Sequence, residues 1–470
     1  MTVSTSHSRG LKDHTSSLIV TALSAAFGVG LIQTTGYLTA IVAQNDISAR
    51  NSVQLALAMV ASVFILIAVY VGSIVTANTF ATIIAGRTRT IALMRLVGAT
   101  AKTLRLSVAR EGLAVGAVGA AIGAAVGLVI VTAALELARA TGAVPDLDYG
   151  AIDPLIVMPA GVVVVATWGA SWVGSRRVLV VTPIQATGAA QERSREETRR
   201  RPVRNGVAAL FFFGGLVALG VGVVLGLVNG LGFIVAFFGG IASFTGVVIG
   251  AHLVIPPLLR LTGRWFGSSA SAQMAAENST RYPERSARTT IGLVIGVTLI
   301  TTFSVAAQGY ADMIAAAQQN EPEAYAGTDD VIAITMAIFT ALIGFSAVIA
   351  AFGMINNLSL SVIQRTRELG LLRALGFTGR QVRGMVVAES AQLTVTGVGI
   401  GLVLGVLYGW AGAQSLLGSM FGGPGLVLPT VPWFLLIVLA VGSALLTLAA
   451  AQIPARKATS VTPVLALAAD

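Results

Sequence analysis

The sequence predicts an all-α polytopic membrane protein of about ten transmembrane helices, arranged as 4 + 2 + 4 around an internal repeat. Three observations lead to this prediction. Hydrophobic residues make up 55% of the 470 residues and charged residues only 11%, whereas soluble domains carry roughly 25% charged residues. Apolar runs long enough to cross about 30 Å of hydrocarbon recur along the whole chain. An arginine-rich segment also occurs twice in the same register.

The apolar runs that lie between charged clusters are the candidate spans. The fifth and sixth runs form one tract that is interrupted only at Asn229-Gly230, a dipeptide typical of tight turns. We predict a helical hairpin there, with a single re-entrant segment as the alternative. The predicted spans are residues 17–43, 53–86, 108–138, 154–178, 205–228, 231–259, 288–310, 331–362, 385–414 and 430–455.

The basic residues predict the orientation of the chain. With a cytoplasmic N-terminus, every Lys and Arg except Arg50 and Arg139 falls in or beside a cytoplasmic segment, as the positive-inside rule requires. We therefore expect a multi-pass protein of the bacterial inner membrane with both termini in the cytoplasm. The net charge of +10 is then an orientation signal, and no basic soluble domain is predicted that would bind nucleic acid. The longest outer loop, residues 311–330, has no room for a large extracytoplasmic domain.

The internal repeat is the most specific feature of the sequence. Residues 87–111 (RTRTIALMRLVGATAKTLRLSVARE) align without gaps on residues 365–389 (RTRELGLLRALGFTGRQVRGMVVAE) at an offset of 278. Both copies lie on the cytoplasmic side, so the repeat is parallel, unlike the inverted repeats of many secondary transporters. The expected organisation is a four-helix unit at 10–190, a cytoplasmic linker at 191–204, a two-helix hairpin at 205–262 and a second four-helix unit at 263–470.

The repeated segments, residues 87–107 and 365–385, predict amphipathic helices at the inner membrane surface. Gly376 is expected to cap or kink the second of these helices before the chain enters the next span. Anchoring to anionic lipid explains the arginines, but docking of a two-fold partner also explains why the segment occurs twice. The candidate docking residues are Arg87, Arg89, Arg95, Gly98, Arg105, Arg365, Arg367, Glu368, Arg373, Gly376 and Arg383.

Polar side chains inside the predicted spans form a second group of candidates, because polar groups are costly in lipid. Asn78 and Asn356 are repeat-equivalent, and an interhelical hydrogen bond explains them at least as well as contact with a substrate. Glycines at fourfold spacing follow each repeated segment and predict close helix packing. The candidate substrate path consists of Gln33, Asn78, Gln308, Tyr310, Asn356 and Gln392. No cysteine is present and the three histidines are far apart in sequence, so no metal site is predicted.

The second copy resembles the signature of FtsX-like (type VII) ABC transporter permeases, which include MacB-like and bacitracin-exporter-like proteins. The matching motifs are RTRELGLLRALG at 365–376, the N-x-x-R-x-P-x-R pattern at 278–285 and the Pro-Ala-Arg close at 454–456. The first copy is a degenerate match, with Thr90 and Ala92 where the pattern has Glu and Gly. The resemblance implies that both repeated segments couple to a cytoplasmic ATPase, present in two copies and carrying the ATP and Mg.

The sequence itself holds no Walker A motif, G-x-x-x-x-G-K-[ST], and no catalytic constellation. We therefore expect a transport subunit with no ATPase site and no cofactor of its own. Short outer loops and an apolar interior favour export of an amphipathic or hydrophobic molecule such as a lipid, peptide or antibiotic. The alternative is a mechanotransmitting regulator of a cell-wall enzyme or sensor, with a small outer partner at 311–330. An ion-coupled secondary transporter is disfavoured by the parallel repeat.

Overall fold

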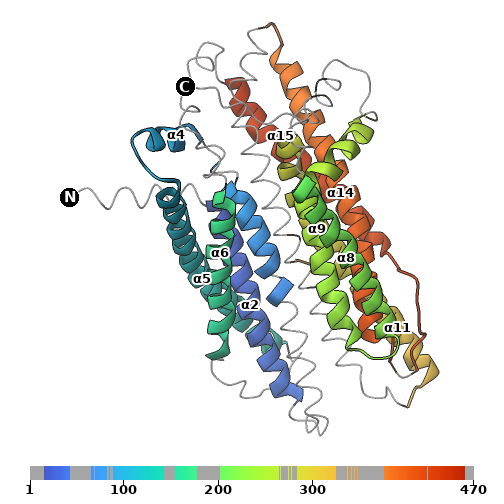
Figure 1. Cartoon of the computed structure of the whole chain (residues 1–470). Coiled ribbons are helices and arrows are strands. Elements are labelled where there is room, and N and C mark those ends of the chain that lie inside the picture. The colour runs from blue at the N-terminus through green and yellow to red at the C-terminus, as the bar shows by residue number, and fades with distance from the viewer. Residues whose placement is uncertain are drawn as a thin grey trace. The chain divides into compact units, whose positions relative to one another are not determined.

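The computed structural model describes residues 15–42, most of 65–84, 88–141, 154–176, 202–263, 283–323, 375–420 and 422–460, with single positions between 265 and 347. Within these ranges every regular element is a helix and no strand occurs, which confirms the all-α class (Figure 1). The elements are α2 (Thr15–Val42), α4 (Thr88–Leu96), α5 (Ala101–Ala140), the 3-10 helix η2 (Pro154–Ile156), α6 (Val157–Gly174), α8 (Pro202–Gly226), α9 (Gly232–Gly263), α11 (Pro283–Asn320), α14 (Gly379–Leu417) and α15 (Trp433–Ser460).

Seven helices among the described residues are long and apolar enough to cross a membrane, so the chain is a multi-pass membrane protein. They coincide with seven of the predicted spans. Two shorter apolar helices, Ile65–Ala81 and Trp433–Leu445, lie within the predicted spans 53–86 and 430–455. The predicted span 331–362 falls almost wholly outside the described residues, and the total of ten stays a prediction.

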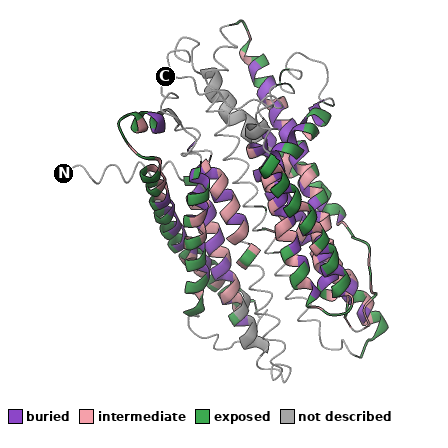
Figure 2. Ribbon diagram, viewed as in Figure 1, coloured by how far each residue is buried: buried purple, intermediate pink, exposed green. Residues whose placement is uncertain are grey.

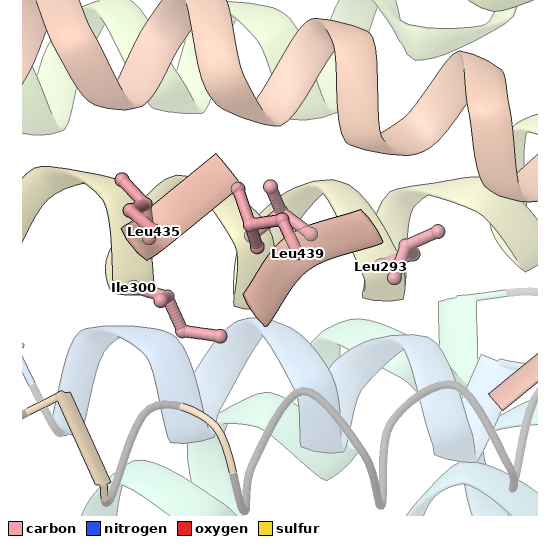
Figure 3. Packing of buried hydrophobic residues seen from close by; sticks show 5 residues of the cluster. Leu293, Ile300, Leu435 and Leu439 are labelled. Atoms are coloured by element: carbon pink, nitrogen blue, oxygen red, sulfur yellow. The ribbon is translucent and has the colours of Figure 1, made fainter. Parts of the chain in front are cut away.

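The chain divides into two compact units, Met1–Gln191 and Glu192–Asp470. In the first unit α5 packs along both α2 and α6. In the second unit α14 contacts α11, α15, α8 and α9. The apolar contact between α11 and α15 is drawn in Figure 3, where Leu293 and Ile300 face Leu435 and Leu439. Among the described helices of the second unit, α14 therefore contacts the largest number of others, whereas α5 in the first unit lies between α2 and α6.

Glycine determines how closely these long helices pack. A Cβ atom built on Gly123 of α5 would lie 2.1 Å from the carbonyl oxygen of Ala22 in α2. In the second unit, a Cβ on Gly405 of α14 would lie 2.8 Å from the carbonyl oxygen of Thr298 in α11. Gly127 is the repeat equivalent of Gly405 and meets α2 in the same way. The predicted packing role of the glycines is confirmed in both copies.

The hairpin predicted at Asn229-Gly230 is present as the turn between α8 and α9. The side-chain carbonyl of Asn229 accepts a hydrogen bond from the Leu231 amide at 3.0 Å, an Asx turn that reverses the chain. α8 and α9 then pack against each other along their length (Figure 1). Each is long enough to span the bilayer, so the described geometry is a pair of helices rather than one re-entrant segment.

The helix faces that point away from the protein are apolar. In Figure 2 exposed residues follow the outward side of α5 and of α8, and most of these residues are aliphatic or aromatic. α11 differs, because most of its apolar stretch is buried by its neighbours. Its length is also a correction: the helix continues to Asn320, so residues 311–320 are not part of the outer loop that the sequence predicted there. Met313 and Ala317 extend its buried face, which the polar composition of this stretch concealed.

Candidate functional site

The first repeated segment folds as a short helix, α4, that lies beyond the end of α5 (Figure 1). Ile91 and Ala92 on one face of α4 are buried against Leu104 and Val108 of α5. Ala92 stands where the family pattern has glycine, and its methyl group is fully buried in this contact. The departure from the pattern at this position therefore contributes to packing between α4 and α5.

The first junction, residues 97–100, separates α4 from α5. Gly98 has φ +104°, a conformation that favours glycine. Its amide bonds to the carbonyl of Arg95 at 3.1 Å, and the Ala99 amide bonds to the carbonyl of Met94 at 2.9 Å. This pair of bonds is the Schellman arrangement that ends a helix. The sequence prediction of one amphipathic helix over 87–107 is thus wrong at its second half, because Gly98 ends α4 and residues 101–107 belong to α5.

Thr100 begins α5 as its N-cap. Its backbone is extended (φ −77°, ψ 152°), and its hydroxyl accepts a hydrogen bond from the Thr103 amide at 3.1 Å. The bond satisfies one of the amides that the first turn of a helix leaves unpaired. The cap lets α5 start in a new direction immediately after α4 has ended.

The second junction, residues 375–378, repeats this backbone. Gly376 has φ +98°, and Thr378 is extended (φ −70°, ψ 152°). The Thr378 hydroxyl accepts from the Gln381 amide at 3.3 Å, while the Gln381 side chain accepts from the Thr378 amide at 2.9 Å, which completes a capping box. The prediction that Gly376 kinks the chain before the next span is confirmed. Two positions that match in sequence therefore match in conformation.

Arg105 makes an intramolecular contact that the sequence did not predict. Its Nε donates to Ser175 Oγ at 3.3 Å and its Nη2 donates to the carbonyl of Trp172 at 3.2 Å. The guanidinium carbon also lies 4.2 Å from the centre of the Trp172 ring, a cation–π distance. The arginine thus joins the start of α5 to the C-terminal end of α6. Its repeat equivalent, Arg383, is exposed on α14.

The remaining docking candidates are only partly described. The Arg95 side chain is half-buried at the end of α4. The rest lie outside the described residues or have side chains outside them: Arg87, Arg89, Arg365, Arg367, Glu368 and Arg373.

Two amides of the candidate substrate path bind within the protein. Gln392 of α14 is only 2% exposed, and its side-chain amide donates to the carbonyl of Leu259 in α9. Gln308 donates to Asp312 Oδ1 at 2.7 Å, one turn along α11. The first bond joins α14 to α9, whereas the second lies within α11. The sequence pointed to Gln392 but not to its partner, because every residue has a backbone carbonyl and the sequence does not show which one lies close.

The other members of this group lie apart along the chain. Gln33 is buried in α2, Asn78 is half-buried in Ile65–Ala81, and Tyr310 is half-buried on α11. Asn356 lies outside the described residues. Across the part of the chain that the structure describes, no group of three or more His, Cys, Asp or Glu could hold a metal ion.

The chain was compared with known proteins. It is 33% identical over 148 residues to YknZ of Bacillus subtilis, an uncharacterized ABC transporter permease (32% of this chain, 35% of YknZ). It is 30% identical over 131 residues to MacB of Bdellovibrio bacteriovorus, a macrolide export ATP-binding/permease protein (28% of this chain, 19% of MacB). It is 31% identical over 127 residues to LolC of Haemophilus influenzae, a lipoprotein-releasing system transmembrane protein (27% of this chain, 32% of LolC).

The chain spans about a third or less of the length of these relatives. The FtsX-like permease C-terminal family matches it twice, at residues 62–183 and 340–463, and each match contains one of the two junctions. Because these two matches together cover more than half of the sequence, the chain belongs to the FtsX-like permease family.

Proposed function

We propose that the chain is the permease subunit of an ABC transporter, which couples ATP hydrolysis by a separate ATPase to the export of an amphipathic or hydrophobic molecule. The observation that carries the proposal is the pair of equivalent junctions, each leading from an arginine-rich segment into a long helix. Membership of the family supports the permease role. MacB is named for macrolide export and LolC for lipoprotein release, which supports a cargo with apolar parts.

The surface of α4 supports docking of a protein. One face is held on α5 by Ile91 and Ala92, while Leu93, Met94 and Val97 are exposed beside Arg95, Val97 to 90%. Exposed methionine and aliphatic groups next to arginine suit a protein interface better than an aqueous surface. The ATPase would bind here and at the second copy, so two ATPase copies are proposed for one chain. Both junctions would face the cytoplasm, together with the two termini.

The lengths of α5 and α14 support a mechanical connection. They have 40 and 39 residues, or roughly 60 Å each at about 1.5 Å per residue. A bilayer core is only about 30 Å thick, so each helix extends well beyond it as one continuous rod. A displacement at either junction would be transmitted along the rod to its neighbours. In the first unit Arg105 would pass the same displacement to α6 through Trp172 and Ser175.

The test is co-purification of the tagged chain with an ATPase that carries a Walker A motif, followed by ATP turnover in liposomes. The combined variant Arg95→Glu and Arg373→Glu reverses one docking charge in each copy and should lose the ATPase and its turnover. Arg139→Glu is the matched control, because Arg139 lies at the other end of α5 in an exposed ion pair with Glu136 at 2.8 Å. Such pairs contribute at most about 1 kcal/mol. Retention of the ATPase by the double variant would exclude docking at these segments.

A further inference from the structure

Buried hydroxyls of the second unit are hydrogen-bonded on α9, α14 and α15, but a row of them on α11 is not. Thr262, Thr394 and Thr447 each bond the carbonyl of the residue four positions earlier. Each also lies 2.9 Å from a hydroxyl on a neighbouring helix. Four residues of α11 are at most 4% exposed and have hydroxyls with no partner in the described part of the chain, namely Thr290, Thr298, Thr301 and Ser304. A buried hydroxyl that has lost water without gaining a partner raises the free energy of the arrangement that holds it.

The same kind of hydroxyl occurs in the equivalent helix of the first unit. Within the described residues, the other two buried hydroxyls without a partner belong to Ser17 and Ser24, and both lie on α2. α2 packs on the glycines of α5 as α11 packs on those of α14. The unpaired hydroxyls of the described chain are therefore confined to the two helices that lie on the glycines of a long helix.

The face of α14 that α11 covers carries glycines at fourfold spacing. A Cβ atom added to any of them would lie 2.9 Å or less from an atom of α11, and they are Gly397, Gly401, Gly405 and Gly409. Thr301 meets this face with its methyl carbon, 2.8 Å from the Cβ position of Gly405, and Thr290 does the same at Gly397, at 3.3 Å. The two threonines therefore turn their methyl groups toward α14. Because the glycines have no side chains that interlock with α11, the two helices can slide along each other without rotamer changes at these positions.

Two other helices of the unit are fixed to α14 by hydrogen bonds. These bonds join α14 to α9 and to α15, and on α14 they come from Gln392, Thr394, Thr396 and Tyr408. A movement of α11 would break none of them. The C-terminal end of α11 does bond the loop between α14 and α15, because the Asn320 amide donates to the carbonyl of Gly422 at 2.8 Å. This exposed bond ends on a loop, so it does not fix α11 to the α14 helix.

We infer that α11 is a moving helix of the second unit, with a second position along the glycine face of α14 in which its four unpaired hydroxyls are hydrogen-bonded. Backbone carbonyls beside the glycines are the acceptors, because no side chain covers them and each carbonyl has a second lone pair. The new bonds stabilise the second position, while the loss of the close contacts between threonine methyl groups and glycines opposes it. The inference rests on the proposed function only for what drives the movement, which is a displacement of the junctions by the ATPase.

The first test asks whether the hydroxyls are unpaired, and it needs no ATPase. The triple variant Thr298→Val, Thr301→Val and Ser304→Ala removes three of them and nearly keeps the shape of the side chains. Its Tm in lipid nanodiscs should exceed that of the wild type by at least about 2 °C, because groups buried without a partner have been removed. Thr394→Val is the matched control, since it removes a hydroxyl with two partners and should lower the Tm. A triple variant that does not unfold above the wild-type temperature would overturn the inference.

The second test measures the position of α11 with two spin labels, because the chain has no cysteine of its own. Nitroxides on Gln319→Cys of α11 and on Val395→Cys of α14, both exposed positions, lie roughly 45 Å apart along the helix axes. A shift of α11 by one helical turn would change this distance by about 5 Å.

During ATP turnover with the ATPase bound, the labelled chain should show a second distance by double electron–electron resonance. The triple variant should reduce the population at this distance by at least about tenfold, because it cannot form the new bonds. One unchanged distance during turnover would overturn the inference. Failure of any ATPase to bind would instead refute the proposed function, and the inference would then stand or fall on the Tm comparison.

Discussion

Replacing Gly123 with alanine should separate the effect of helix contact from that of helix propensity in the first unit. The added Cβ would lie 2.1 Å from the Ala22 carbonyl oxygen and 2.9 Å from its Cα, against at least 3.4 Å for an ordinary contact. Because both are backbone atoms, no side-chain rotation can relieve the clash. α2 must instead move away from α5 by roughly an ångström or more, which disturbs the whole interface.

The expected magnitude follows from two opposing terms. Overpacking a tight contact costs about 1–3 kcal/mol, whereas alanine is favoured over glycine within a helix by about 1 kcal/mol. Gly161→Ala provides the control, since Gly161 lies in α6 with no atom within 4 Å of its Cβ position. Both substitutions gain the same propensity, and only Gly123→Ala meets the clash. The stabilities of the two variants should therefore differ by about 1–3 kcal/mol.

Thermal unfolding in lipid nanodiscs measures this difference. For a unit of this size each kcal/mol corresponds to roughly 2–4 °C in Tm. Trp168 and Trp172 of α6 are the tryptophans of the first unit and report its unfolding by fluorescence. Gly161→Ala should unfold at or slightly above the wild-type temperature and Gly123→Ala clearly below Gly161→Ala. Equal Tm values for the two variants would refute the close approach of α2 and α5.

Three further substitutions test the first junction, its contact with α6, and the end of α14 that lies farthest from the second junction. Gly98→Ala places a side chain at φ +104° and should cost about 1–2 kcal/mol, seen as faster hydrogen exchange at the Ala99 amide. Arg105→Leu removes two hydrogen bonds and the cation–π contact with Trp172. The fluorescence emission of Trp172 should change and the free energy of unfolding should fall by about 1–2 kcal/mol. Arg110 is exposed, so Arg110→Leu should change neither quantity. Gln414→Leu frees the Gly425 carbonyl and the Val427 amide, which Gln414 binds at 2.7 and 2.9 Å, and should expose residues 422–427 to proteolysis.

The features that could be predicted are those that appear in the sequence as apolar runs, turn dipeptides or repeated segments. The apolar runs predicted the helices, Asn229-Gly230 predicted the hairpin turn, and Gly376 predicted the bend before the second long helix. The α4–α5 boundary was misplaced because residues 97–107 continue the amphipathic pattern across a break that only the backbone at Gly98 reveals. The continuation of α11 to Asn320 was missed because its polar residues look like a loop.

The contacts between helices could not be predicted in the same way. Gln392 was singled out as a polar residue in a span, yet its partner is a carbonyl of Leu259, which any residue type would provide. Arg105 was grouped with the docking arginines because it shares their register, although it binds Trp172 and Ser175 about seventy residues away. A single sequence shows which groups need a partner, while the partner itself is decided by how the helices pack.

The two copies of the repeat therefore share the backbone conformation of their junctions but differ in the helices that α5 and α14 contact. Both junctions have the same glycine conformation and the same threonine cap, as two equivalent partners would require. Beyond the junctions the copies differ: Arg105 holds α5 to α6 in the first, while α14 in the second is bonded to the hairpin through Thr396 and Tyr408. Equal displacements at the two junctions would therefore move different sets of helices. Thr396→Val, which introduces the residue found at the equivalent Val118, and Tyr408→Phe together remove the hydroxyl bonds between α14 and α9. The double variant should weaken the contact of the hairpin with α14 and leave the second junction unaltered.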